Sequence, residues 1–146
     1  MTAGAFTLGA ESQDGEFVRQ DSRIRDWVTA DGSSGYRAEP GRYHLYVALA
    51  CPWSHRAVIA RMLKRLEHVV GISYIHPFRD DRGWAFTRGE FTDELHGWSF
   101  LSEAYEATES GYDGRVSVPV LWDREAGRIV SNESADIVRM LNCEFE

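Results

Sequence analysis

The feature that most constrains this chain is a strand–helix–strand pattern over residues 43–75. Short apolar runs at 43–49 and 69–75 are typical of buried strands. Between them, Pro52 suits the first turn of a helix, and one apolar helix face is predicted from the spacing of Ile59, Met62, Leu63 and Leu66. The pattern therefore predicts a right-handed βαβ unit with two parallel strands.

The rest of the chain extends this unit. After a long polar loop at 77–98, helical spacing over 100–108 precedes a third strand at 116–121. A turn at 123–127 leads into a strand at 128–130, which predicts a hairpin. A last helix is expected to begin between Asn132 and Ser134. The order β-α-β-α-β-β-α is that of a thioredoxin-like α/β fold with helices on both faces of the sheet.

Length and charge bound the remaining possibilities. The 146 residues suit one domain, which we place at 41–146 after an N-terminal extension at 1–40 with isolated apolar anchors at Phe6, Phe17, Ile24 and Trp27. A net charge of −7 disfavours nucleic acid and anionic membranes as partners. No apolar run approaches the ~20 residues that span a bilayer, and two cysteines are too few for a disulfide framework. We expect a cytoplasmic protein.

Cys51 is the sharpest chemical feature of the sequence. It lies between a predicted buried strand and the first turn of a helix, where N–H groups and the helix dipole stabilise an anion. Such a position can lower the pKa of a thiol from ~8.5 into the range ~3.5–7.5, and His55 and Arg56 would add positive potential if they point back. The alternative is a buried structural cysteine, since a free thiol packs as a small hydrophobe.

The residue three positions after Cys51 is Ser54, so no neighbouring thiol can resolve a disulfide formed there. A second small thiol from outside the chain would have to do so. Cys143 lies far along the sequence near the chain end, and we interpret it as incidental to the chemistry.

Three weaker signals lie further along the chain. Pro119 falls inside the predicted third strand, which calls for a turn, an edge position or a cis bond; if cis, the main chain of Val118 could pair with an extended peptide. Glu133 and Ser134 open the last helix and either bind an ammonium and a carboxylate or simply cap the helix. Trp84 in the long loop is either a lid over a ligand or a packing anchor.

Other chemistries find no support in the sequence. Four further histidines are scattered without metal-ligand spacing: His44, His68, His76 and His96. There is no phosphate-binding glycine loop and no pattern of paired carboxylates. We therefore expect neither a metal nor a nucleotide cofactor.

The segment Cys51-Pro52-Trp53-Ser54-His55-Arg56 strongly resembles the active-site stretch of the glutathionyl-hydroquinone reductases, the omega-like Xi class of glutathione transferases. The resemblance continues through five further blocks in the same order: His76-Pro77, Gly83 to Phe86, Gly114 to Asp123, Ile129 to Ala135, and Arg139 to Asn142. It covers the chain from about Phe17 onward and corresponds to the N-terminal thioredoxin-like portion of the family.

The resemblance implies that Cys51 is the catalytic nucleophile and that glutathione lies along the thioredoxin-like domain. It implies that the cysteinyl backbone of glutathione pairs with Val118 before a cis Pro119, and that Glu133 and Ser134 receive the γ-glutamyl end. Two tryptophans complete the implied glutathione site, Trp53 in the cysteine motif and Trp84 in the long loop.

The implied reaction is a thiol exchange without a metal. Cys51 would attack the sulfur of a glutathionyl-hydroquinone, release the hydroquinone and leave a mixed disulfide that a second glutathione resolves. Two alternatives stay open: a non-catalytic glutathione-binding module, and a glutaredoxin-like deglutathionylase. The family carries a helical domain after the thioredoxin-like one, and the sequence stops before it, so we expect exposed apolar surface that favours self-association, with a homodimer as one outcome.

Overall fold

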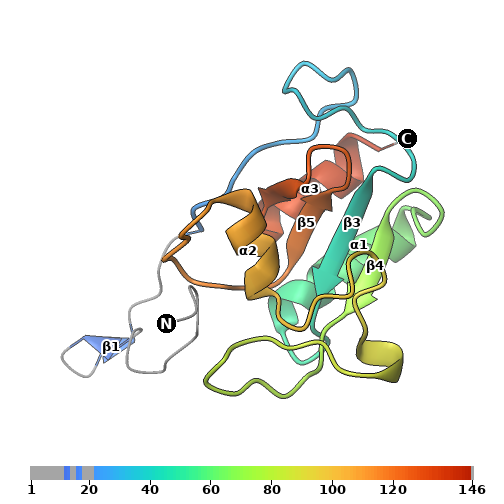
Figure 1. The fold of residues 1–146 in the computed structure, drawn as a ribbon. Coiled ribbons are helices and arrows are strands. Elements are labelled where there is room, and N and C mark those ends of the chain that lie inside the picture. The colour runs from blue at the N-terminus through green and yellow to red at the C-terminus, as the bar shows by residue number, and fades with distance from the viewer. Residues whose placement is uncertain (1–11, 14–15, 18–21, 146) are drawn as a thin grey trace.

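The computed structural model describes residues 12–13, 16–17 and 22–145 and contains a four-stranded mixed sheet (Figure 1). Its strand order is β4 (Gly71–Tyr74), β3 (Tyr43–Val47), β5 (Val120–Asp123) and β6 (Arg128–Ser131). β3 runs parallel to β4 and antiparallel to β5, and β5 pairs antiparallel with β6. The parallel pair and the hairpin are thus confirmed.

Helices cover both faces of this sheet (Figure 1). α1 (Pro52–Leu63) and α3 (Ser134–Cys143) lie on one face, and α2 (Ser102–Thr108) lies on the other. A short 3-10 helix, η2 (Gly89–Phe91), interrupts the long loop, and β1 (Ser12–Gln13) pairs with β2 (Glu16–Phe17) near the N-terminus. The predicted element order and the thioredoxin-like fold are confirmed.

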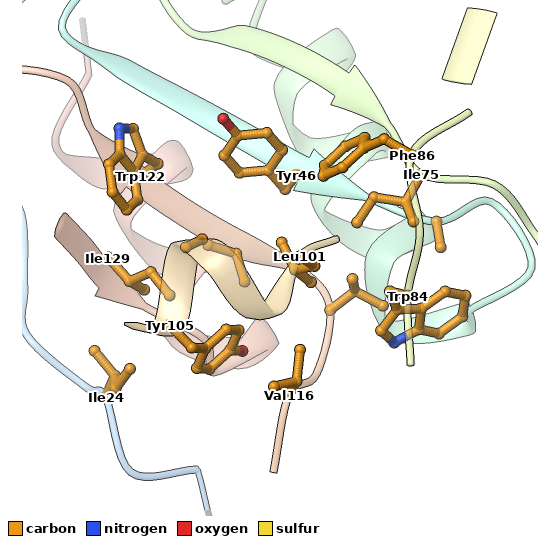
Figure 2. Close-up of a cluster of buried hydrophobic side chains, with 14 of the residues drawn as sticks. Ile24, Tyr46, Ile75, Trp84, Phe86, Leu101, Tyr105, Val116, Trp122 and Ile129 are labelled. Atoms are coloured by element: carbon orange, nitrogen blue, oxygen red, sulfur yellow. The ribbon is translucent and has the colours of Figure 1, made fainter. Parts of the chain in front are cut away.

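The sheet separates two apolar clusters because successive side chains of a strand point to opposite faces. All five residues of β3 are buried; Leu45 and Val47 pack toward α1 and α3, whereas Tyr46 packs on the α2 side. Figure 2 shows the α2-side cluster, to which the sheet contributes Tyr46 and Trp122 and the segments outside the sheet contribute Tyr105 and Trp84.

The prediction that the apolar side of the first helix faces the core is wrong. Ile59, Met62 and Leu63 are 42%, 57% and 78% exposed, and only Leu66, beyond the helix end, is buried. The face of α1 that meets the sheet carries Ser54, Ala57, Val58 and Arg61 instead. Arg61 is accommodated because its guanidinium donates to the carbonyl oxygens of Val70 (2.7 Å) and Glu67 (3.2 Å).

The third strand begins later than its apolar run predicts. β5 starts at Val120, so Pro119 precedes the strand rather than lying inside it. This placement removes the conflict with the sheet, because a proline just before a strand takes no donor from the ladder. The Val118–Pro119 peptide bond is cis.

Residues 22–28 lie along the core rather than away from it. Ile24 belongs to the α2-side cluster, Val28 belongs to the cluster under α1 and α3, and Trp27 packs against the latter. The predicted anchors Ile24 and Trp27 are therefore confirmed; Phe17 is in β2, and Phe6 lies outside the described residues.

The long loop is tied to the sheet by one buried carboxylate. Asp93 accepts hydrogen bonds from the Tyr46 hydroxyl (2.9 Å) and from the main-chain N–H groups of Leu95, His96 and Trp98. Burial and this carboxylate raise the pKa of Tyr46. Within the part of the chain that the structure describes, no helix is long and apolar enough to cross a membrane.

Candidate functional site

Cys51 occupies the junction between β3 and α1. It is the N-cap residue of α1, with extended backbone angles (φ −102°, ψ 120°), and Pro52 fills the first helical position. Its main-chain N–H donates to the Ala48 carbonyl (2.9 Å), and its carbonyl accepts from the N–H of His55 (3.1 Å). The half-buried thiol is that of a free cysteine and makes no capping hydrogen bond. Because Cys51 is the N-cap, it lies at the positive end of the helix dipole.

Ser54 has a structural role that the sequence does not reveal. It is fully buried, and its Oγ accepts a hydrogen bond from the main-chain N–H of Ala48 (3.2 Å). This bond closes the turn between β3 and α1 from the helix side. The residue at the position of a resolving thiol therefore holds the loop that carries Cys51.

The basic residues after Cys51 lie on the outer side of the helix. His55 and Arg56 are exposed, and the Arg56 guanidinium lies over the ring of Trp53 at 5.5 Å. Trp53 itself is 42% exposed, so its indole forms an open apolar surface next to Cys51 in the chain.

Val118 presents main-chain groups at the cis bond. Its side chain belongs to the α2-side cluster, and Cys51 packs against that same cluster. Among the described residues, none forms a hydrogen bond with the N–H or C=O of Val118. Buried main-chain groups are nearly always paired, so these two groups are suited to an extended ligand.

Trp84 packs as a core residue. It is 7% exposed within the α2-side cluster, its carbonyl accepts from the N–H of Leu101 (3.0 Å), and the Arg79 guanidinium covers its ring at 4.9 Å. Figure 2 places Trp84 at the end of the cluster farthest from Trp122. Its position joins it to Val118 and Cys51 through one cluster, with most of its surface buried.

Glu133 caps α3 with its own side chain. Its Oε1 accepts from the N–H of Ala135 (3.3 Å), and its main-chain N–H donates to Oγ of Ser131 (3.1 Å). Ser134 is the first helical residue and is 8% exposed. Glu133 therefore does cap the helix, and its half-buried carboxylate faces the helix N-terminus.

Tyr105 connects the two loops that carry these groups. Its hydroxyl donates to the carbonyl of Ser117 (2.7 Å) and accepts from the amide of Asn132 (3.1 Å). Ser117 precedes Val118, and Asn132 precedes Glu133. Burial raises the pKa of Tyr105, so the phenol stays protonated as a donor. Helical spacing identifies Tyr105 only as a core residue, and no sequence signal links it to either loop.

A groove of about 490 Å³ lies elsewhere, between α1 and α3. It is lined partly by the exposed side chains of α1, Ile59 and Leu63, and by Val138 and Arg139 of α3. Arg56 also lines it, whereas Cys51 and the predicted glutathione-binding residues do not. Cys143, at the end of α3, is exposed. No cluster of three or more metal-ligating side chains occurs among the described residues.

Comparisons with known proteins agree with this architecture. The family model "Glutathione S-transferase, N-terminal domain" matches residues 50–143. The glutathionyl-hydroquinone reductase YqjG of Escherichia coli is 46% identical over 145 residues, and the reductase PcpF of Sphingobium chlorophenolicum is 42% identical over 138. Each match covers 93% of this chain but 44% and 43% of the relatives, so the chain spans less than half of their length.

Solved structures agree with the sequence matches. The glutathione-bound structure of YqjG superposes with a TM-score of 0.79 at 46% identity, covering 82% of this chain and 42% of that one. The glutathione S-transferase Xi of Phanerochaete chrysosporium superposes with a TM-score of 0.80 at 40% identity, covering 86% and 43%.

Proposed function

Because this chain belongs to the glutathione S-transferase family and corresponds to the N-terminal portion of glutathionyl-hydroquinone reductases, we propose that it binds glutathione and carries the reductase chemistry on Cys51. Its cosubstrate is glutathione, and its second substrate is a glutathionyl-hydroquinone.

The place of Cys51 supports its role as the nucleophile. A thiolate is the reactive form of cysteine, and the N-terminus of a helix favours negative charge through its dipole and its unpaired N–H groups. Cys51 is the N-cap of a 12-residue helix and makes no capping hydrogen bond that would compete for its sulfur. The half-buried side chain is accessible to a small thiol.

The main-chain groups of Val118 favour binding of an extended ligand near the Cys51 sulfur. A tripeptide that pairs with its N–H and C=O would satisfy two groups that have no partner among the described residues. Cys51 packs against the cluster to which Val118 belongs, and the proposal places the cysteinyl residue of the tripeptide between the two.

The start of α3 supports recognition of the γ-glutamyl end. This end of glutathione carries an ammonium and a carboxylate. The Glu133 carboxylate attracts the ammonium, and the first turn of α3, with the hydroxyl of Ser134, attracts the carboxylate.

The first chemical step is attack by the Cys51 thiolate on the glutathione sulfur of the glutathionyl-hydroquinone. A sulfur–sulfur bond forms and the carbon–sulfur bond to the ring breaks. The electron pair of that bond goes to the ring carbon, which takes up a proton and leaves as the hydroquinone. The ring is reduced, and the two sulfurs are oxidised to a mixed disulfide.

In the second step, the thiolate of another glutathione attacks the glutathionyl sulfur of the mixed disulfide. Glutathione disulfide leaves, and the Cys51 thiolate is regenerated. No resolving cysteine is needed from the chain, which fits the structural hydroxyl at Ser54.

The observation that carries this proposal is a free cysteine at the N-cap of α1, packed against the cluster that contains Val118 of the cis bond. The test follows hydroquinone release from a glutathionyl-hydroquinone in the presence of glutathione. Cys51→Ala is expected to abolish release and Cys143→Ala to leave it nearly unchanged; equal activity of the two variants would refute the role of Cys51.

Two controls separate the alternatives. Glutathione binding by calorimetry without turnover would identify a non-catalytic binding module. Turnover of a glutathionylated peptide in preference to the hydroquinone conjugate would identify a deglutathionylase.

A further inference from the structure

Residues 24–26 extend the sheet along the free side of β6. The N–H of Asp26 donates to the carbonyl of Val130 (2.9 Å), and the N–H of Asn132 donates to the carbonyl of Ile24 (3.0 Å). Arg25 and Ser131 form an antiparallel bridge between these bonds. The segment is therefore fixed next to the start of α3 by main-chain hydrogen bonds.

This pairing brings the side chain of Arg25, and that of Ser22 just before the paired residues, to carboxylates at the start of α3. Arg25 forms a two-bond ion pair with Asp136 (2.8 and 3.1 Å). Ser22 donates from Oγ to Oε2 of Glu133 at 2.8 Å, across 111 residues of sequence. Both partners of the second bond are half-buried.

The two oxygens of Glu133 are thus held from two sides. Oε1 accepts from the N–H of Ala135, and Oε2 accepts from Ser22. An ionised carboxylate has about four lone-pair positions, so these two bonds leave capacity for a ligand. A hydroxyl orients the carboxylate without cancelling its charge, whereas an arginine in the same place would neutralise it.

We propose that Ser22 is a positioning residue that fixes the Glu133 carboxylate for the α-ammonium of the γ-glutamyl group. This inference rests on the proposed function and extends the glutathione site to the segment before the thioredoxin-like core. Ser22 acts through Glu133. Loss of the Ser22 hydroxyl leaves the negative charge of Glu133 in place but allows the carboxylate to change rotamer. Ligand binding must then fix that rotamer itself, and the entropy lost weakens the affinity.

The test compares two ligands and three variants in the full chain by calorimetry. The ligands are glutathione and N-glutaryl-cysteinylglycine, which lacks the α-amino group. Ser22→Ala is expected to weaken glutathione binding about fivefold, as for the loss of one orienting hydrogen bond. It is expected to leave the affinity for the glutaryl analogue unchanged. Ser22→Thr keeps the hydroxyl and restores glutathione affinity.

Ser34→Ala is the matched control, because among the residues that the structure describes the hydroxyl of Ser34 bonds only within its own turn, to Thr29 and Tyr36. It should bind both ligands as the unmodified chain does. Unchanged glutathione affinity in Ser22→Ala, or equal weakening of both ligands, overturns the role of Ser22 alone. If the unmodified chain binds no glutathione, the proposed function fails and this inference fails with it.

Discussion

Tyr105 and Ser117 exchange two hydrogen bonds: the Tyr105 hydroxyl donates to the Ser117 carbonyl (2.7 Å) and accepts from the Ser117 N–H (3.2 Å). The same hydroxyl accepts from the side-chain amide of Asn132 (3.1 Å). One buried oxygen thereby fixes the loop before Val118 relative to the loop before Glu133.

Tyr105→Phe is expected to destabilise the chain by about 2 kcal/mol, because it leaves the Ser117 N–H and the Asn132 amide buried without this acceptor. It should also weaken glutathione binding. Urea unfolding and calorimetry measure the two effects. Tyr112→Phe is the matched control, since that hydroxyl makes one hydrogen bond within the described part of the chain, to the Arg115 carbonyl (2.9 Å). Equal losses in both variants would contradict the connecting role of Tyr105.

Leu63 and Leu66, at the end of α1 and just beyond it, differ in burial. Leu66 is 4% exposed, whereas Leu63 is 78% exposed. Leu66→Ala should lower the free energy of unfolding by about 3 kcal/mol, because it leaves a cavity in the core. Leu63→Ala should change it by less than about 0.5 kcal/mol. Urea unfolding measures both changes. A larger loss of unfolding free energy for Leu63→Ala than for Leu66→Ala would show that the apolar side of α1 predicted from the sequence is buried after all.

His44 makes stability depend on pH. Burial lowers its pKa from 6.5 to about 4, although Asp93 acts in the opposite direction. Between these values the unfolded chain binds a proton at His44 that the folded chain does not, so stability falls as pH falls. The loss reaches about 3 kcal/mol by pH 4 and is absent above 6.5.

His44→Gln should flatten the curve of unfolding free energy against pH between about 4 and 6.5, whatever its effect at neutral pH. His68→Gln is the control, since His68 is exposed, and should keep the slope of the unmodified chain. An unchanged slope in His44→Gln would contradict a buried neutral imidazole.

Arg42 compensates a fully buried carboxylate. Two hydrogen bonds (2.9 and 2.8 Å) join its guanidinium to Asp123, whose side chain is 0% exposed. Burial alone would raise the pKa of Asp123, but Arg42 and the N–H groups of Ala126 and Glu125 keep it below its usual value. Arg42→Met should cost about 3 kcal/mol because it leaves this charge buried without its partner.

Arg82→Met is the matched control for that change. Arg82 pairs with Asp80 at 2.7 Å, but its side chain is 64% exposed. Its replacement should alter the free energy of unfolding by less than about 0.5 kcal/mol. Similar losses in the two variants, measured by urea unfolding, would show that burial of Asp123 does not matter.

The element order and the place of Cys51 were predictable because their signals are local. An apolar run, a cysteine and a proline in succession place a thiol at a helix N-cap without any long-range contact. The core-facing side of α1 was not predictable in this way. Arg61 can be buried because it donates to the carbonyls of Glu67 and Val70. Hydrophobic periodicity contains no information about such hydrogen-bond partners.

The support around the site depends on contacts between distant residues. Tyr105 reaches Ser117 and Asn132, and Ser22 reaches Glu133 across 111 residues. No pattern of spacing encodes these pairs. The resemblance to a known family linked Cys51, Trp84, Val118 and Glu133 in sequence, whereas the apolar cluster that joins the first three became visible only in the fold.

The most direct test of the account is to trap the intermediate on Cys51. The chain is mixed with a glutathionyl-hydroquinone in the absence of free glutathione, and the products are analysed by peptide-mapping mass spectrometry. We expect one hydroquinone released per chain and a glutathionyl adduct on the peptide that contains Cys51, in the unmodified chain and in Cys143→Ala alike. Release of hydroquinone without that adduct, or an adduct confined to Cys143, would contradict it.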